Sequence, residues 1–315
     1  MGSTVYLVIP CYNEEEALPE TVRQLSEKLK ELIASGKADE KSRMLFVDDG
    51  SRDKTWSLID GFSKDNPYVC GIKLAHNRGH QNALLAGLMT AREQAECTIS
   101  LDADLQDDVD ALDQFLDRFQ EGCDIVYGVR SKRDQDTKFK RGTAQGFYRF
   151  MHRLGVEIVY DHADYRLMSR RALEALSEYR EVNLFLRGIV PQLGYRTDKV
   201  YYVRKERLAG ESKYPLKKMI QFALEGITSF SVQPLKLISN LGIAISLLSV
   251  LGLLYALISY FMGAAVSGWT AIVCSLWLLG GIQLLCLGVI GVYIGKIYGE
   301  VKARPRFHIE TTRLQ

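Results

Sequence analysis

The segment from Leu237 to Gly295 contains no Asp, Glu, Lys or Arg in 59 residues. A bilayer core requires about 20 apolar residues per helix, so this length predicts two membrane-spanning helices joined by a short turn. We place them at about 237–262 and 270–295. The alternative, a buried hairpin of a soluble protein, would have no amphipathic face over the whole segment. We therefore predict a C-terminal membrane domain, residues 230–315, with a short basic tail.

Positive charges flank the uncharged segment on both sides, whereas its predicted turn, residues 263–269, has none. By the positive-inside rule, both flanks lie in the cytoplasm. We expect a multi-pass protein of the cytoplasmic (inner) membrane, with residues 1–229 on the cytoplasmic side. The flanking residues are Lys217, Lys218 and Lys236 before the segment, and Lys296, Lys302, Arg304 and Arg306 after it.

The first third of the chain alternates short apolar runs with helical patterns. Four such βα units in a row imply a parallel sheet with right-handed crossovers, whose ligands lie at the carboxyl ends of the strands. We therefore predict an α/β fold with a Rossmann-like, mainly parallel sheet within residues 1–229. The predicted strands are 5–9, 44–47, 69–74 and 97–101, and the predicted helices are 16–35, 55–64 and 81–94.

An acidic pair, Asp102 and Asp104, follows the fourth predicted strand. Two carboxylates suit a hard divalent cation, Mg2+ or Mn2+, that keeps several waters and shares its remaining positions with a diphosphate. Gln106 can add a neutral oxygen. Asp-x-Asp alone is common by chance, so the interpretation depends on the neighbouring motifs.

Four segments together resemble the family 2 glycosyltransferases, which bind nucleotide sugars with a GT-A fold. They are VIPCYNEE at 8–15, VDDGSRDKT at 47–55, NRGHQNALLAG at 77–87 and LDADLQDD at 101–108. The resemblance implies a metal held by Asp102, Asp104 and Gln106 against the donor diphosphate. Taken singly, Asp48 and Asp49 can equally cap a helix and Tyr12 can pack in the core. The implied donor-binding residues are Pro10, Tyr12, Asn13, Glu14, Asp48, Asp49, Gly79, Asp102, Ala103 and Asp104.

Two basic amphipathic stretches, about 138–154 and 214–228, lie between the acidic pair and the membrane segment. Helices of this kind lie in the plane of the membrane interface and attract anionic headgroups. The alternative is a solvated basic face that packs on the domain. The nearby membrane spans favour interfacial helices.

HADYRLM at 162–168 and RKERLAGESKY at 204–214 resemble the polyprenyl-phosphate branch of the same family. That branch includes dolichyl-phosphate mannose synthases and bacterial undecaprenyl-phosphate glycosyltransferases. The resemblance implies inverting transfer of a sugar, from a UDP-linked glucose or N-acetylhexosamine donor, to undecaprenyl phosphate for cell-envelope glycosylation. Asp164 is the candidate catalytic carboxylate beside Asp104, although Asp164 can instead simply pair with Arg166. The candidates for the acceptor phosphate and the diphosphate are Arg130, Arg141, Arg207, Ser212 and Lys213.

Other functions fit the sequence less well. A processive polysaccharide synthase would carry an Arg-Trp motif, which is missing, and two spans are few for a polymer channel. A non-catalytic, membrane-anchored nucleotide-sugar-binding protein would not need the intact acidic pair. A nucleotidyltransferase would have a glycine-rich basic loop near the first strand. We expect no nucleic-acid partner.

The second predicted span contains a small-xxx-small pattern at Gly291 and Gly295. Such residues let helices approach closely in lipid. We predict a homo-oligomer, a dimer or tetramer, with packing against the first span of the same chain as the alternative.

Overall fold

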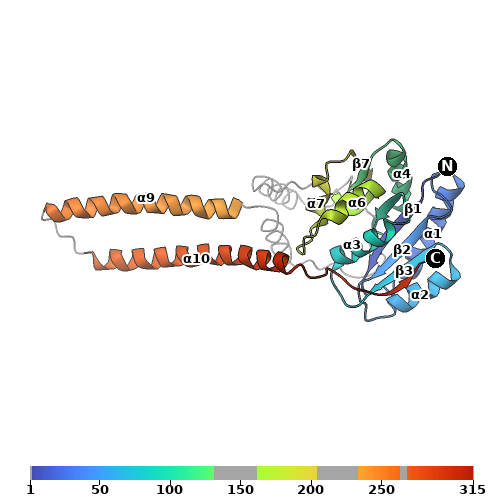
Figure 1. Ribbon diagram of the computed structural model, residues 1–315, viewed down its shortest axis with the longest axis horizontal. Coiled ribbons are helices and arrows are strands. Elements are labelled where there is room, and N and C mark those ends of the chain that lie inside the picture. Colours follow the sequence, from blue (N-terminus) through green and yellow to red (C-terminus); the bar gives the residue numbers. More distant parts are fainter. Residues whose placement is uncertain (1, 131–161, 204–232, 263–267, 315) are drawn as a thin grey trace. The chain divides into compact units, whose positions relative to one another are not determined.

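The computed structural model describes residues 2–130, 162–203, 233–262 and 268–314 (Figure 1). Within these residues the chain divides into two compact units. The sheet unit includes the described residues up to 203, together with 303–314. The helical unit includes 233–262 and 268–302.

The sheet unit is built on eight strands in the order β7-β5-β6-β4-β1-β2-β3-β8. Strands β1 to β4 are mutually parallel, which confirms the predicted series of βα units. Strand β6 is antiparallel to both β4 and β5, so the sheet is mixed beyond β4. The strands are β1 Val5–Cys11, β2 Arg43–Asp48, β3 Val69–Leu74, β4 Cys97–Ser100, β5 Ile125–Arg130, β6 His162–Ser169, β7 Thr197–Tyr202 and β8 Ile309–Arg313.

Helices cover both faces of this sheet (Figure 1). On one face the buried side of α1 joins inward residues of β1 and β2 in the core. On the other face α3 lies so close that a Cβ atom on Gly87 would come within 2.4 Å of Val8 and 2.7 Å of Val47. Only glycine permits this approach. The helices are α1 Leu18–Ala34, α2 Thr55–Asp65, α3 His80–Ala91, the short η1 Val109–Ala111, α4 Leu112–Gln120, α6 Arg170–Glu178 and α7 Leu186–Gln192.

The C-terminal residues of the predicted membrane domain, residues 230–315, belong instead to the sheet unit. Ile309–Arg313 forms β8, an antiparallel strand on the edge of β3 in the sheet unit. Two ion pairs support it, Lys73 with Glu310 at 3.1 Å and Arg313 with Asp60 at 2.7 Å. The strand is mostly exposed, and its sequence lacks the apolar alternation that would have predicted it.

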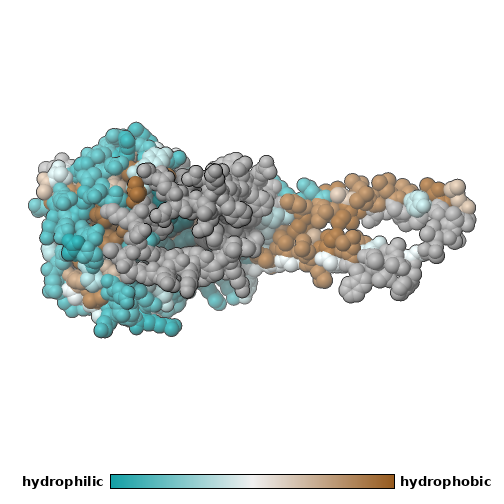
Figure 2. Space-filling model, turned by 180° about the vertical axis from the view of Figure 1, so that it is seen from behind, coloured by the Kyte–Doolittle hydropathy of each residue, from teal (hydrophilic) through white to brown (hydrophobic). Residues whose placement is uncertain are grey.

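The helical unit contains α9, Gln233–Phe261, and α10, Trp269–Lys302, at the positions predicted for the two spans. Apolar side chains cover most of their visible surface, whereas the sheet unit is mainly hydrophilic in the same view (Figure 2). Among the described residues, Leu278–Lys302 is the one helix long and apolar enough to cross a membrane, with a mean hydropathy of 2.0. The two-span topology stays a prediction.

Several predicted features lie outside the described residues. They are the interfacial helices at 138–154 and 214–228 and the phosphate candidates Arg141, Arg207, Ser212 and Lys213.

Candidate functional site

The loop after β1 is fastened to the loop after β2 by hydrogen bonds between backbone and side chains. Asn13 N donates to Ser51 Oγ at 3.0 Å, and Asn13 Oδ1 accepts from Arg52 N at 3.0 Å. Glu14 N donates to Thr55 Oγ1 at 2.9 Å. Tyr12 is 42% exposed at the tip of this arrangement, so it does not pack in the core. The two loops therefore form one rigid rim beside the buried end of β1.

Asp48 and Asp49 end β2 but have different surroundings. Asp48 is fully buried; its Oδ1 accepts from Ser51 N at 3.1 Å, while its Oδ2 has no hydrogen-bond partner among the described residues. Burial raises the pKa of Asp48. An unpaired buried acceptor is costly, so it fits a ligand that supplies an N–H group.

Asp49 instead fixes the loop after β3. Its two carboxylate oxygens accept from the backbone N–H groups of Arg78 at 2.7 Å and Gly79 at 2.9 Å. Gly79 has a φ of 85°, a conformation that glycine adopts at little cost. Asp49 therefore positions the start of α3, which is consistent with a structural role rather than direct contact with a donor.

The acidic loop after β4 turns sharply at Leu105. Leu105 has a φ of 53°, and Gln106 N donates to Asp104 Oδ1 at 3.2 Å. The Ala103 side chain is buried, and its carbonyl accepts from Thr21 Oγ1 at 2.7 Å. Asp102 keeps 38% of its side chain exposed. The loop is therefore anchored to α1 while Asp102 stays accessible.

These residues fit a metal site in which a bound ligand and water complete the coordination, not one in which protein side chains supply every ligand. In the described part of the chain no group of three His, Cys, Asp or Glu side chains is placed to hold an ion. Mg2+ and Mn2+ bind readily through one or two carboxylates with the remaining positions on phosphate and water. Asp102 and Asp104 match that requirement. Burial raises the pKa of Asp102 to about 6, with His80 opposing the shift.

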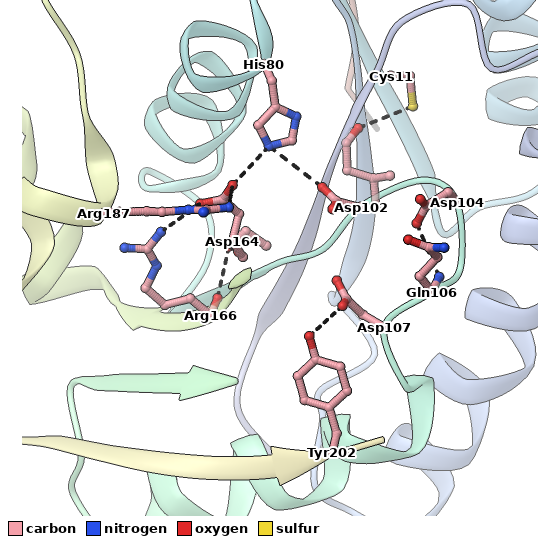
Figure 3. Close-up of polar contacts among 12 residues, drawn as sticks. Cys11, His80, Asp102, Asp104, Gln106, Asp107, Asp164, Arg166, Arg187 and Tyr202 are labelled. Atoms are coloured by element: carbon pink, nitrogen blue, oxygen red, sulfur yellow. Dashed lines mark hydrogen bonds and ion pairs between the residues drawn. The ribbon is translucent and has the colours of Figure 1, made fainter. Parts of the chain in front are cut away.

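A charged cluster connects the acidic loop with β6, α3 and α7 (Figure 3). Arg187 makes two hydrogen bonds to Asp164, Nε to Oδ1 at 3.1 Å and Nη2 to Oδ2 at 2.9 Å. His80 Nε2 lies 3.5 Å from Asp164 Oδ2 and 3.7 Å from Asp102 Oδ1. Arg166, the partner that the sequence suggested for Asp164, is farther away, with Nη2 at 3.7 Å from Oδ1.

The same contacts set the protonation of this cluster. Burial alone would raise the pKa of Asp164, but the hydrogen bond with His80 and the charge of Arg187 hold it well below its usual value. Burial would likewise lower the pKa of His80, yet Asp164 and Asp102 raise it. Asp164 is therefore an anion with little tendency to accept a proton.

Arg130, the described member of the predicted phosphate group, lies at the end of β5. It is in register with Tyr202 on the parallel strand β7. The Tyr202 hydroxyl donates to Asp107 Oδ1 at 2.6 Å, and Asp107 belongs to the acidic loop (Figure 3). This bond ties the β5–β7 edge to the loop that carries Asp102 and Asp104.

Sequence reasoning missed two residues of this site. His80 lies within the segment NRGHQNALLAG, but the sequence pattern did not predict it as a site residue. Arg187 lies in none of the motifs, and only its pairing with Asp164, distant in sequence, reveals it.

The site lies where strand order reverses, because β2 and β4 flank β1 on opposite sides. This is the position at which open α/β sheets bind ligands. The loops after β1 and β2 offer the buried acceptor of Asp48 and the exposed ring of Tyr12. The acidic loop and the cluster around Asp164 offer carboxylates and guanidinium groups. The arrangement suits a ligand with a polar ring at one end and phosphate at the other.

Comparison with known proteins gives a consistent family. The model of the family "Glycosyl transferase family 2" matches residues 6–177. The uncharacterized glycosyltransferase YkoT of Bacillus subtilis (strain 168) is 52% identical over 96% of this chain and 90% of that protein. The bactoprenol glucosyl transferase of Shigella phage SfX is 37% identical over 98% of this chain and 99% of that protein.

A solved structure is also similar, the glucosyl-3-phosphoglycerate synthase from Mycobacterium tuberculosis. It has a TM-score of 0.45 and 16% sequence identity, and the match covers 72% of this chain and 77% of that one. The assignment rests on the family match and the sequence relatives. The chain belongs to the family 2 glycosyltransferases, with their GT-A fold.

Proposed function

We propose that the protein transfers a sugar from a UDP-sugar, glucose or an N-acetylhexosamine, to undecaprenyl phosphate. The observation that carries this proposal is the match with a bactoprenol glucosyl transferase over 98% of the chain, since it includes α9 and α10 as well as the sheet unit. A lipid-linked acceptor also accounts for an enzyme that carries an apolar helix long enough to cross a membrane.

The donor would bind across the loops after β1, β2 and β4. Asp48 Oδ2 would accept the N–H of the base, which satisfies a buried acceptor that lacks a partner among the described residues. Tyr12 offers an exposed ring to the base or ribose, and Pro10, Asn13 and Glu14 shape the rim. The backbone at Gly79 and Ala103 would complete the pocket.

Asp102 and Asp104, with Gln106 beside them, would hold Mg2+ or Mn2+. When bound, the ion would neutralise the developing charge on the departing diphosphate. Asp49 would contribute indirectly, by fixing the backbone before α3.

The reaction would be a single displacement. An oxygen of the acceptor phosphate forms a bond to the anomeric carbon as the bond from that carbon to the diphosphate breaks, so the configuration inverts. A phosphate monoester has a second pKa of about 6 and is mostly deprotonated at neutral pH. A strong base is therefore unnecessary, in agreement with the low proton affinity of Asp164. Arg130, with Arg141, Arg207, Ser212 and Lys213, would screen the two approaching anions.

A turnover screen tests this proposal. The purified full-length protein would be incubated with undecaprenyl phosphate, Mg2+ and each of a panel of radiolabelled UDP- and GDP-sugars. We expect one donor to label the lipid fraction. Label in a polymer would favour a processive synthase, and binding of a donor without any transfer would favour a non-catalytic nucleotide-sugar-binding protein.

The proposal includes a cytoplasmic active site and two membrane spans. A reporter fused after Gln315 should then be cytoplasmic, and one inserted between Ser267 and Gly268 should be external. Finding both on one side of the membrane would exclude the two-span topology.

Self-association is a separate part of the proposal. Apart from the adjacent residues and the nearby backbone of α10 itself, no heavy atom of the described residues lies within 4 Å of a Cβ added at Gly291 or Gly295, so this face of α10 has room for a neighbouring helix. Cross-linking in native membranes should give dimers or tetramers that weaken in Gly291→Leu. Only monomers at native expression would contradict it.

A further inference from the structure

Two arginines surround the single carboxylate of Asp164. Arg187 holds both of its oxygens and stays 33% exposed on the site side of α7. Arg166 is 2% exposed, and its Nη1 is buried without a hydrogen-bond partner among the described residues. The start of α7 is fixed to α3, because Leu186 N donates to Gln81 Oε1 at 2.9 Å. Arg187 is therefore held at a defined position beside His80.

Several cationic groups gather around Asp164 in this cluster. Guanidinium groups stay protonated in proteins, so Arg166 and Arg187 bring two positive charges to one Asp164. His80 adds a further positive charge whenever it is protonated, and Asp102 on its far side, at 3.7 Å, compensates that one. A buried cation and an unpaired buried N–H group are both costly. A ligand with an acceptor oxygen for Arg166 Nη1 would remove the second of these costs.

Asp164 is badly placed to act as a base. Oδ1 faces Arg187 Nε at 3.1 Å and Arg166 Nη2 at 3.7 Å, and Oδ2 faces Arg187 Nη2 at 2.9 Å and His80 Nε2 at 3.5 Å. A carboxylate has about four lone-pair directions, and four basic N–H groups surround this one. A general base needs a lone pair directed at the proton that it removes.

We propose that Arg187, with Arg166 beneath it, forms the binding site for the terminal phosphate of the acceptor, and that Asp164 is the positioning residue for both arginines. The proposal rests on the function proposed above and assigns the acceptor subsite within it. Arg187 is then the catalytic contact with the attacking phosphate, and no proton passes to Asp164. A phosphate dianion offers several acceptor oxygens, and the planar fork of arginine suits them.

The chain supplies a matched control. Arg171 on α6 also binds a carboxylate, that of Asp124, through Nε and Nη2. This pair lies outside the site, and Arg171 is 64% exposed. Arg171→Lys therefore makes the same chemical change to an arginine–aspartate pair without touching the proposed subsite.

The test uses full-length protein in detergent, a labelled UDP-sugar and undecaprenyl phosphate. Because lysine cannot reproduce a two-bond fork, Arg187→Lys should raise KM for the lipid phosphate about 10-fold or more and change KM for the donor less than about 2-fold. Asp164→Asn should give the same pattern. The double variant should have a KM for the lipid phosphate little higher than that of either single variant, because both changes disrupt the same Arg187–Asp164 pair. Arg171→Lys should match the wild type.

The opposite result would overturn the proposal. If Asp164 is a base, Asp164→Asn should lower kcat about 100-fold or more with KM for the acceptor unchanged, while Arg187→Lys has a small effect. Equal loss of donor and acceptor affinity in Arg187→Lys would also overturn it.

Binding of farnesyl phosphate, a short soluble prenyl phosphate, separates this proposal from the proposed function. If the wild type transfers no sugar, the proposed function fails. The phosphate subsite is then supported by binding that is about 10-fold weaker in Arg187→Lys than in Arg171→Lys. Equal binding by the two variants would overturn it. Circular dichroism of each variant establishes that it is folded.

Discussion

The loops after β1, β2 and β3 contrast with the charged cluster that β6 and α7 form around Asp164. In the first region, carboxylates accept backbone N–H groups: Asp49 binds two of them, and Asp53 Oδ2 accepts one from Glu15 N at 3.2 Å. In the second, charged side chains contact each other, as in the pair of Asp164 with Arg187. The first arrangement suits the neutral ring of the proposed donor, and the second suits the proposed acceptor phosphate.

The largest expected effect concerns the acidic loop. Asp104→Asn should lower turnover by at least about 100-fold with the fold intact, because the charge that stabilises the departing diphosphate is lost. EDTA should do the same, and Mg2+ or Mn2+ should restore activity. Asp110→Asn, which changes an exposed carboxylate paired with Lys28, is the control. Full activity in EDTA would contradict the metal assignment.

The donor pocket gives the next effect. Asp48→Asn replaces an acceptor by a group that is partly a donor, so KM for the UDP-sugar should rise about 10-fold or more. KM for lipid phosphate should stay near the wild-type value. Steady-state kinetics with each substrate varied would measure both. An equal rise in the two KM values would show that the regions do not divide the substrates.

Asp49 should affect stability more than chemistry. Asp49→Ala leaves two backbone N–H groups without their partners, at a cost of about 1–3 kcal/mol. Thermal unfolding in detergent should show a lower Tm. A variant with unchanged Tm but lost donor binding would mean that Asp49 contacts the nucleotide directly.

The smallest effect is a pH dependence of stability in the absence of divalent cations. The folded protein raises the pKa of Asp102 to about 6 from its usual value near 4, so between these values the folded state holds a proton that the unfolded state has lost. This contribution therefore decreases as pH rises from about 4 to 6. The lowered pKa of Asp164 acts oppositely, since its contribution is lost as pH falls below about 4.

Asp102→Asn tests this opposition. Its Tm relative to wild type should increase between about pH 4 and pH 6, because the variant has no charge to bury. A constant difference in Tm across that range would contradict the raised pKa.

Local pattern was sufficient for the first region and insufficient for the second. Apolar runs predicted β1 to β4, and polar clusters at their ends predicted the donor loops. Strand β6 was missed because Asp164 and Arg166 interrupt its apolar pattern, although Arg166 is buried. Arg187 was missed because its partner, Asp164, is distant in the sequence. The exposed strand β8 was not predicted, because a strand that only covers the edge of a sheet needs no apolar face and so has no apolar alternation.

The central claim is that the first region binds the donor and the second binds the acceptor phosphate. Equilibrium binding of a UDP-sugar and of farnesyl phosphate, each measured separately on Asp48→Asn and Arg187→Lys, tests it most directly. We predict a crossed result, in which Asp48→Asn loses the nucleotide sugar, Arg187→Lys loses the prenyl phosphate, and each keeps the other ligand. If both variants lose the same ligand, the division of the site is wrong.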